Sequence, residues 1–280
     1  MFSVLLYYKY TPIDDPKKLR DAQRELCQKF DIKGRIIISE EGINGTCAGT
    51  KAAIEEYKRV TGLVPGLEDM EWKESLSQTQ VFPKLKVKVR PEIVTLGLKK
   101  ERVDVSIQNS AQYIEPEELY QLYENGEDVV VIDARNLYEG VVGQFENAIV
   151  PDIQNFRDFP EYVKNNLSHL KDKQVVTYCT GGIRCEKASA YLKEQGFANV
   201  RQLHGGIHTY GEKTGGKHFQ GKLYVFDGRV VMDVNTIDPS IISQCQFCGA
   251  ETAAYRDCSE PSCGPQFICC DGCFKENGGY

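Results

Sequence analysis

Residues 175–196, VVTYCTGGIRCEKASAYLKEQG, decide the fold of the central part of the chain. Their first four residues form a short, mostly apolar run that is typical of a buried parallel strand, and the helix that follows ends at Gly196. Similar strand runs at Val129–Asp133 and Val200–Leu203 alternate with helical segments. This alternation predicts a parallel sheet with helices on its faces.

Cys179 is placed between that strand and the N-terminus of the helix. Backbone N–H groups of a tight glycine loop converge on one point, and the helix dipole adds partial positive charge. We therefore expect an anion cradle that lowers the pKa of the Cys179 thiol and makes it a reactive nucleophile. The cradle loop consists of Thr180, Gly181, Gly182 and Ile183.

Arg184 completes a C-x-x-G-x-R pattern, which favours a reactive site over a small buried cysteine at a strand end. We expect Arg184 to strengthen the field of the cradle and to hold an oxyanion through two hydrogen bonds. Cys185 lies in the first helical turn, where a thiolate is also favoured. It either resolves an oxidised Cys179 as a disulfide or packs against the sheet. Asp133 and Arg135 are expected to form a structural ion pair.

Residues 1–92 predict strands and helices in the order β-α-β-β-α-β, which is the ferredoxin-like arrangement. Asp15 is expected to cap the first helix. The apolar face predicted for this helix is Leu19, Ala22, Leu26 and Phe30. A second helix is expected from about Thr50 to Val60, with a stop at Gly62.

The same N-terminal part is the only third of the sequence with a net positive charge, in a chain whose net charge is −6. It has 16 Lys and Arg against 14 Asp and Glu. The stretch FPKLKVKVR alternates, so a strand would project its cations from one face. These cations are Lys84, Lys86, Lys88 and Arg90. Such a row suits RNA phosphates, and it equally suits a solvated edge strand on which lysines discourage strand pairing.

Seven of the 11 cysteines lie in the last 36 residues. In a reducing compartment such crowding indicates metal binding before a disulfide framework. The spacing of two C-x2-C pairs predicts one tetrahedral structural zinc site, formed by Cys245, Cys248, Cys270 and Cys273. Cys258 and Cys263 are alternative ligands, and Cys269 competes with its neighbour Cys270. Free thiols, or a disulfide formed on oxidation, are the alternatives to zinc.

Four motifs of the central segment resemble a rhodanese domain. They are Asp133-Ala134-Arg135, Tyr138-Glu139 with GQFENAI at 143–149, the Cys179 loop, and Gly205-Gly206-Ile207. Together with the N-terminal domain and the cysteine-rich tail, nearly the whole chain resembles the rhodanese-domain tRNA uridine(34) hydroxylases (TrhO). The Cys–Arg loop is one residue shorter than the C-x5-R cradle of cysteine phosphatases, which suits a persulfide sulfur.

This resemblance implies oxygen-dependent hydroxylation of the wobble uridine of tRNA, position 34 in the anticodon loop, to 5-hydroxyuridine. Cys179 would be the essential cysteine and molecular oxygen the co-substrate. A persulfide sulfurtransferase that acts on thiosulfate, or that passes persulfide sulfur from Cys179 to an RNA or protein acceptor, is the alternative enzyme. A non-catalytic RNA- or zinc-binding protein is a third reading, against which the intact Cys179 and Arg184 argue.

We therefore expect a multidomain α/β and α+β protein. Its parts are a ferredoxin-like (acylphosphatase-like) RNA-binding domain at 1–92, a linker at 93–110, a rhodanese domain at 111–215 and a short β stretch with a cysteine-rich tail at 216–280. No motif predicts a flavin, nicotinamide or haem site. No membrane or protein partner is evident, and the N-terminus lacks a signal peptide, so we expect a cytoplasmic protein.

Overall fold

The computed structural model describes residues 1–98, 109–257 and 266–276. The chain forms two compact units, and each is described by itself. The first comprises Met1–Gly97 with Phe226–Arg229, and the second comprises Leu98–Val225 with Val230–Tyr280. Every helix in the described ranges is too short or too polar to cross a lipid bilayer.

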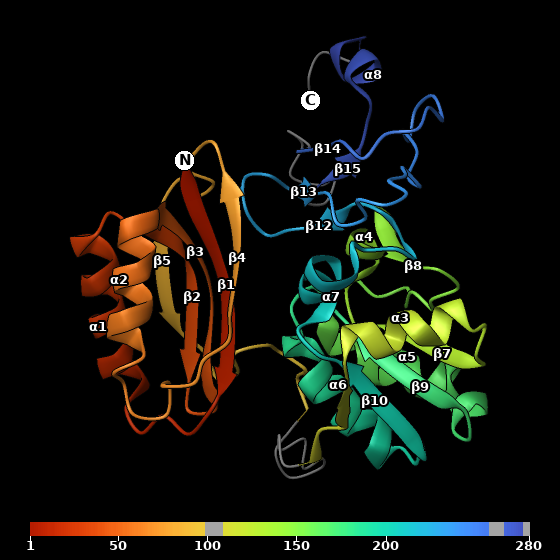
Figure 1. The fold of residues 1–280 in the computed structure, drawn as a ribbon, viewed down its shortest axis with the longest axis horizontal. Coiled ribbons are helices and arrows are strands. Elements are labelled where there is room, and N and C mark those ends of the chain that lie inside the picture. Colours follow the sequence, from red (N-terminus) through yellow and green to blue (C-terminus); the bar gives the residue numbers. More distant parts are fainter. Residues whose placement is uncertain (99–108, 258–265, 277–280) are drawn as a thin grey trace. The chain divides into compact units, whose positions relative to one another are not determined.

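The first unit is a five-stranded sheet with both of its helices on one face (Figure 1). The strand order is β4-β1-β3-β2-β5, with β5 parallel to β2 and the other neighbours antiparallel. Its elements are β1 Phe2–Tyr10, α1 Pro16–Lys29, β2 Lys33–Ser39, β3 Gly42–Thr50, α2 Lys51–Thr61, β4 Trp72–Ser77 and β5 Leu85–Val89. The ferredoxin-like prediction is confirmed, and β5 extends the sheet at the edge next to β2.

The cap of α1 is as predicted, and of its predicted apolar face Leu19, Leu26 and Phe30 pack on the core whereas Ala22 does not. The Asp15 carboxylate accepts hydrogen bonds from the N–H groups of Lys17 and Lys18. The buried positions are Leu19, Gln23 and Cys27, whereas Ala22 is exposed. Gln23 is buried because its side chain has partners: it accepts from Tyr57 Oη at 2.5 Å and donates to Thr61 Oγ1 at 3.3 Å. A polar residue that finds such partners replaces the alanine that the pattern predicted.

The second unit is built on a four-stranded parallel sheet of order β6-β10-β9-β7, as the alternation predicted. Its elements are β6 Gln112–Ile114, α3 Pro116–Glu124, β7 Val129–Asp133, α4 Leu137–Gly140, β8 Gly143–Phe145, α5 Phe159–Asn166, β9 Gln174–Tyr178, α6 Ile183–Glu194, β10 Asn199–Leu203, α7 Gly206–Thr214 and β11 Phe219–Gly221. The core between the sheet and α3 and α7 includes Val131, Val176 and Leu203. Cys179 directly follows the inner strand β9, so it lies at the carboxyl edge of the sheet, where ligands bind in open α/β folds.

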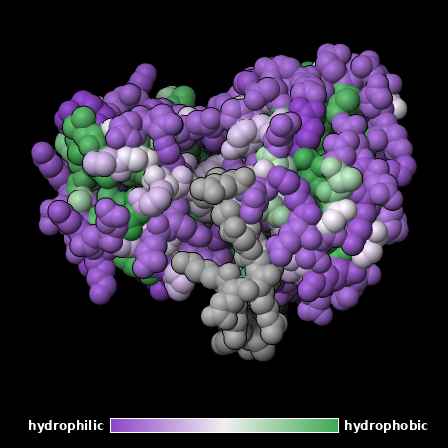
Figure 2. All heavy atoms as spheres, turned by 90° about the horizontal axis from the view of Figure 1, so that it is seen from below, coloured by the Kyte–Doolittle hydropathy of each residue, from purple (hydrophilic) through white to green (hydrophobic). Residues whose placement is uncertain are grey.

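The C-terminal part continues the second unit with short hairpins (Figure 1). Its elements are β12 Leu223–Tyr224, β13 Val231–Met232, β14 Tyr255–Arg256, β15 Phe267–Ile268 and α8 Asp271–Glu276. The β stretch expected after residue 216 is the β12–β13 pair. Figure 2 shows a mostly hydrophilic face on which hydrophobic side chains form separate small groups.

Candidate active site

The loop after β9 forms the predicted cradle around Cys179. The backbone N–H of Gly182 donates to Cys179 Sγ at 3.2 Å, and the N–H of Arg184 also bonds this sulfur. Gly182 has a φ of 103°, a conformation that favours glycine and that turns the chain into α6. Cys179 is fully buried, and Thr180 and Ile183 are the half-exposed positions of the loop.

The pKa of the Cys179 thiol is lowered to about 6. Burial, which is the largest influence, acts in the opposite direction and raises it. A hydrogen bond from the Cys185 thiol, the positive charge of Arg184 and the two loop amides together outweigh burial. At neutral pH Cys179 is therefore mainly a thiolate, as the sequence predicted.

The side chain of Arg184 acts on this thiolate through its positive charge, because the Nη1 and Nη2 groups of its guanidinium already bond another residue. Its Nη1 and Nη2 donate to the two carboxylate oxygens of Glu139 at 2.6 and 2.7 Å. Glu139 is fully buried and Arg184 is 7% exposed. Glu139 therefore occupies the Nη1–Nη2 fork of Arg184 in this arrangement, and the bidentate binding of a ligand oxyanion by Arg184 stays a prediction.

Glu139 is the residue that sequence reasoning missed. It appeared only within a family motif, without a role. Its signal is the spacing Asn136-x-x-Glu139 at the start of α4, a capping box in which Glu139 Oε1 accepts from the Asn136 N–H at 3.1 Å. The same carboxylate therefore caps α4 and fixes Arg184 beside Cys179.

Cys185 is a neutral thiol and not a second thiolate. It is fully buried, and burial, followed by the neighbouring Cys179, raises its pKa well above the ordinary value. The helix N-terminus, which we expected to favour a Cys185 thiolate, is outweighed by this burial. Its S–H donates to the Cys179 thiolate, so the two sulfurs are in direct contact.

A second glycine loop packs against the cradle from the start of α7. The N–H groups of Ile207 and His208 donate to the carbonyl oxygens of Cys179 and Thr180 at 3.0 and 3.1 Å. Gly206 has a φ of 66°, and a Cβ added to it would lie 2.4 Å from the carbonyl oxygen of Cys179. A side chain at this position would therefore push the cradle loop out of place.

The ion pair predicted between Asp133 and Arg135 is confirmed. Both side chains are fully buried, and Arg135 Nη2 lies 2.6 Å from Asp133 Oδ2. Arg135 also donates to the carbonyl oxygen of Gly143 at 2.6 Å. The pair thus joins β7 to β8 and has a structural role.

The basic residues of β5 alternate as predicted. Leu85 and Val87 pack toward the helices, and the cations Lys84, Lys86, Lys88 and Arg90 are all exposed. Among the described residues, none of the four pairs with a carboxylate. Arg35 of β2, which sequence reasoning missed, lies opposite Lys86 in the strand register and is exposed as well.

These cations crowd one another. The pKa of Lys86 is lowered by the charge of Lys84 first, then by partial desolvation and by Arg35 and Lys88. Bringing an anion to the strip would relieve this repulsion. We use the name basic strip for the four predicted cations together with Arg35.

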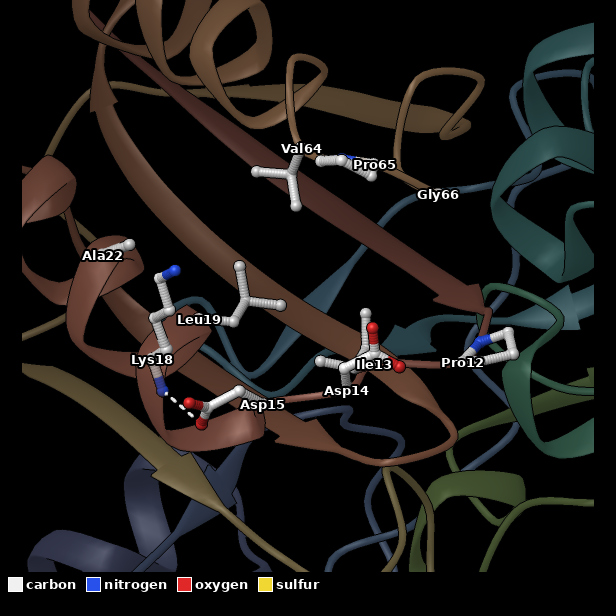
Figure 3. Close-up of a pocket in the computed structure, with 10 residues that line it drawn as sticks. All are labelled: Pro12, Ile13, Asp14, Asp15, Lys18, Leu19, Ala22, Val64, Pro65 and Gly66. Carbon is white, nitrogen blue, oxygen red and sulfur yellow. Dashed lines mark hydrogen bonds between the residues drawn. The ribbon is translucent and has the colours of Figure 1, made fainter.

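The first unit also holds a pocket of about 580 Å³ between the β1–α1 loop and the α2–β4 loop (Figure 3). It opens at the N-terminus of α1, a position that often binds phosphate. Here the Asp15 carboxylate already takes the hydrogen bonds of the free N–H groups, and Asp14 adds a second negative charge. The N-terminus of α1 therefore has no N–H group of Lys17 or Lys18 left to bind a phosphate in this pocket.

The four cysteines predicted as metal ligands do come together. The sulfur atoms of Cys245, Cys248, Cys270 and Cys273 all lie within 4.8 Å of one another. Cys258 and Cys263, the alternative ligands, lie outside the described residues.

Comparison with known protein families gives matches in three parts of the chain. The UPF0176 acylphosphatase-like domain matches residues 2–93, the rhodanese-like domain matches residues 115–213, and the rhodanese C-terminal domain matches residues 220–280. Three curated relatives, each called tRNA uridine(34) hydroxylase, span nearly the whole chain.

The relative from Cytophaga hutchinsonii is 46% identical over 99% of this chain and 88% of its own length. The relative from Staphylococcus haemolyticus is 44% identical over 95% of this chain and 83% of its own length. The relative from Corynebacterium jeikeium is 45% identical over 96% of this chain and 89% of its own length. At such identity over such coverage, the chain belongs to the tRNA uridine(34) hydroxylase family.

Proposed function

We propose that this protein hydroxylates the wobble uridine of tRNA, position 34, to 5-hydroxyuridine in the cytoplasm, with Cys179 at the reaction centre. Family membership supports the substrate. The observation that carries the role of Cys179 is the cradle, which holds a buried sulfur as a thiolate at neutral pH. Burial excludes water from this sulfur, so its charge acts at full strength on a reacting atom.

The basic strip is proposed to bind the phosphates of the anticodon arm. Its cations are exposed, lack carboxylate partners among the described residues and lie on the sheet face opposite α1 and α2. A base in the anticodon loop is unpaired or readily splayed, so reaching it costs little energy. Matched controls are available on the helices, where Lys17, Lys29 and Lys51 are also exposed.

Molecular oxygen is the proposed source of the added oxygen atom. Hydroxylation inserts one oxygen atom into the C5–H bond of uracil and releases the other as water, which consumes two electrons and two protons. An assay therefore has to contain a reductant, and a small thiol is the simplest choice.

The test uses tRNA incubated with the protein and a thiol under isotopically heavy oxygen gas, followed by mass spectrometry of the nucleosides. The proposal predicts 5-hydroxyuridine that carries the heavy isotope. A thiolated uridine has the same nominal mass gain as an unlabelled hydroxyuridine, but it acquires no heavy oxygen. Thiolated product would therefore favour the sulfurtransferase, and unmodified tRNA would contradict the proposed hydroxylation.

A further inference from the structure

Four cysteines of the C-terminal part form a cluster that the proposed hydroxylation does not use. Cys245 and Cys248 come from one turn, and Cys270 and Cys273 come from the start of α8. Backbone hydrogen bonds join the two segments: the Gln246 N–H donates to the Ile268 carbonyl at 3.1 Å. The cluster is thus built by paired strands and turns.

In the first C-x2-C turn, backbone N–H groups point at the sulfur of the first cysteine. N–H groups of Cys270, Phe247 and Cys248 bond the sulfur of Cys245. The turn closes with Gly249, whose N–H donates to the Cys245 carbonyl at 2.9 Å and whose φ is 73°. A left-handed residue here favours glycine and directs the amides inward.

The second turn repeats part of this arrangement. The N–H of Cys273 donates to Cys270 Sγ at 3.5 Å, and the Phe274 N–H donates to the Cys270 carbonyl at 3.0 Å. The second turn therefore also directs a backbone N–H at the sulfur of its first cysteine.

The sulfur separations distinguish a metal site from a disulfide. A disulfide requires about 2.05 Å between the sulfurs. A tetrahedral zinc ion with Zn–S bonds of about 2.3 Å places its ligands about 3.8 Å apart. Cys248 Sγ and Cys270 Sγ are 3.7 Å apart, and every sulfur in the cluster lies within 4.8 Å of the others. The cluster therefore fits one tetrahedral ion.

We propose that Cys245, Cys248, Cys270 and Cys273 bind one Zn²⁺ ion in a closed, structural site. Four thiolates select a borderline-soft ion such as zinc over the hard ions magnesium and calcium, and four protein ligands leave no open position for catalysis. Cys269, although adjacent in sequence, is buried and its sulfur donates to the Cys270 carbonyl at 3.4 Å. It lies outside the set of four.

The surrounding segment shows what such an ion would stabilise. From residue 240 onward, the buried apolar side chains among the described residues are Cys245, Ile268 and Cys269. So small a core does not fold alone without a metal or a crosslink. The ion supplies that crosslink.

The segment held by the ion also touches the support of the active site. The Tyr255 hydroxyl of β14 donates to the carbonyl oxygen of Tyr138 in α4. The ring of Tyr224 packs edge-on against both tyrosines, with centroid distances of 5.3 Å. The metal-held segment thus contacts α4, the helix that carries Glu139 and so fixes Arg184.

The experiment measures zinc in protein purified under reducing conditions without chelator and then supplied with Zn²⁺. We expect about one ion per chain, released on alkylation of four thiols. The Cys270→Ser/Cys273→Ser double variant should lose it, and Cys269→Ser, the matched control, should keep it. Substitution with Co²⁺ should give the visible spectrum of a tetrahedral thiolate site.

Zinc-free wild-type protein after this treatment would overturn the proposal, as would a double variant that holds zinc like the wild type. Metal content does not depend on tRNA or oxygen. Failure of the zinc site would therefore be distinct from failure of the proposed hydroxylation.

Discussion

Replacing Cys185 with alanine should raise the pKa of Cys179, because it removes the thiol that donates to the Cys179 thiolate. Hydrogen bonds to charged groups contribute about 1.5–3 kcal/mol. With about 1.4 kcal/mol for each pKa unit, the pKa of Cys179 should rise from about 6 to ~7–8. The thiolate fraction at neutral pH should then fall from about 90% to about 10–50%.

Cys185→Ser is the matched control, since a serine hydroxyl also donates to an anion. It should leave the pKa of Cys179 close to that of the wild type. A resolving thiol behaves differently, because serine and alanine both fail to form a disulfide. The pair of variants therefore separates the role of a hydrogen-bond donor from that of a resolving thiol.

The assay is the ultraviolet absorbance of the thiolate as a function of pH, with the Cys179→Ser protein as the blank. Absorbance is preferred to alkylation because Cys179 is fully buried and a reagent reports access as well as charge. An unchanged titration curve in Cys185→Ala would refute the reasoning. Equal loss of tRNA hydroxylation in both Cys185 variants would show that Cys185 resolves a disulfide.

Four further outcomes are expected. Hydroxylation should fall as pH drops through about 6, because the lowered pKa of Cys179 keeps the thiolate only above that value; a rate that rises toward pH 5 would contradict it. Glu139→Gln leaves the buried Arg184 charge unpaired and should cost about 3–5 kcal/mol of unfolding free energy, measured by denaturant titration. Gly206→Ala should change the ultraviolet titration curve of the Cys179 thiolate, because the added methyl group would collide with the cradle loop. Gly126→Ala is the control and should leave the curve unchanged, because Gly126 has the same φ of 66° but no atom near the position of the added methyl group. Alanine at Lys84, Lys86 and Lys88 should reduce the salt slope of tRNA binding by about 2, and alanine at the three helix lysines should not.

Much of the fold could be predicted because strand runs, helix caps and glycine stops are signals within short stretches of sequence. Strand runs bounded by glycine predicted β9 and α6, and the Asp15 cap and the Gly62 stop were found where expected. The burial of Gln23 in α1 was not predicted because it depends on Tyr57 and Thr61, which lie far along the chain. A periodicity of apolar residues contains no information about such partners.

The part of the candidate site that was predicted also depends on local signals in the sequence. The cradle consists of consecutive residues, so its amides and its cysteine are visible in the sequence. The contact of Arg184 with Glu139 was not predicted because Glu139 is 45 residues away and meets Arg184 only in the folded unit. The pKa of Cys185 was misjudged because helix position is local, whereas complete burial is a property of the whole unit.

The most direct test of the account is hydroxylation of tRNA by the Cys179→Ser protein under heavy oxygen gas. The substitution changes one buried atom, so the variant should fold and bind tRNA like the wild type, which circular dichroism and a binding titration check first. The account predicts no labelled 5-hydroxyuridine above the protein-free blank. Labelled product at a rate close to that of the wild type would contradict it, because the cradle would then not be the reaction centre.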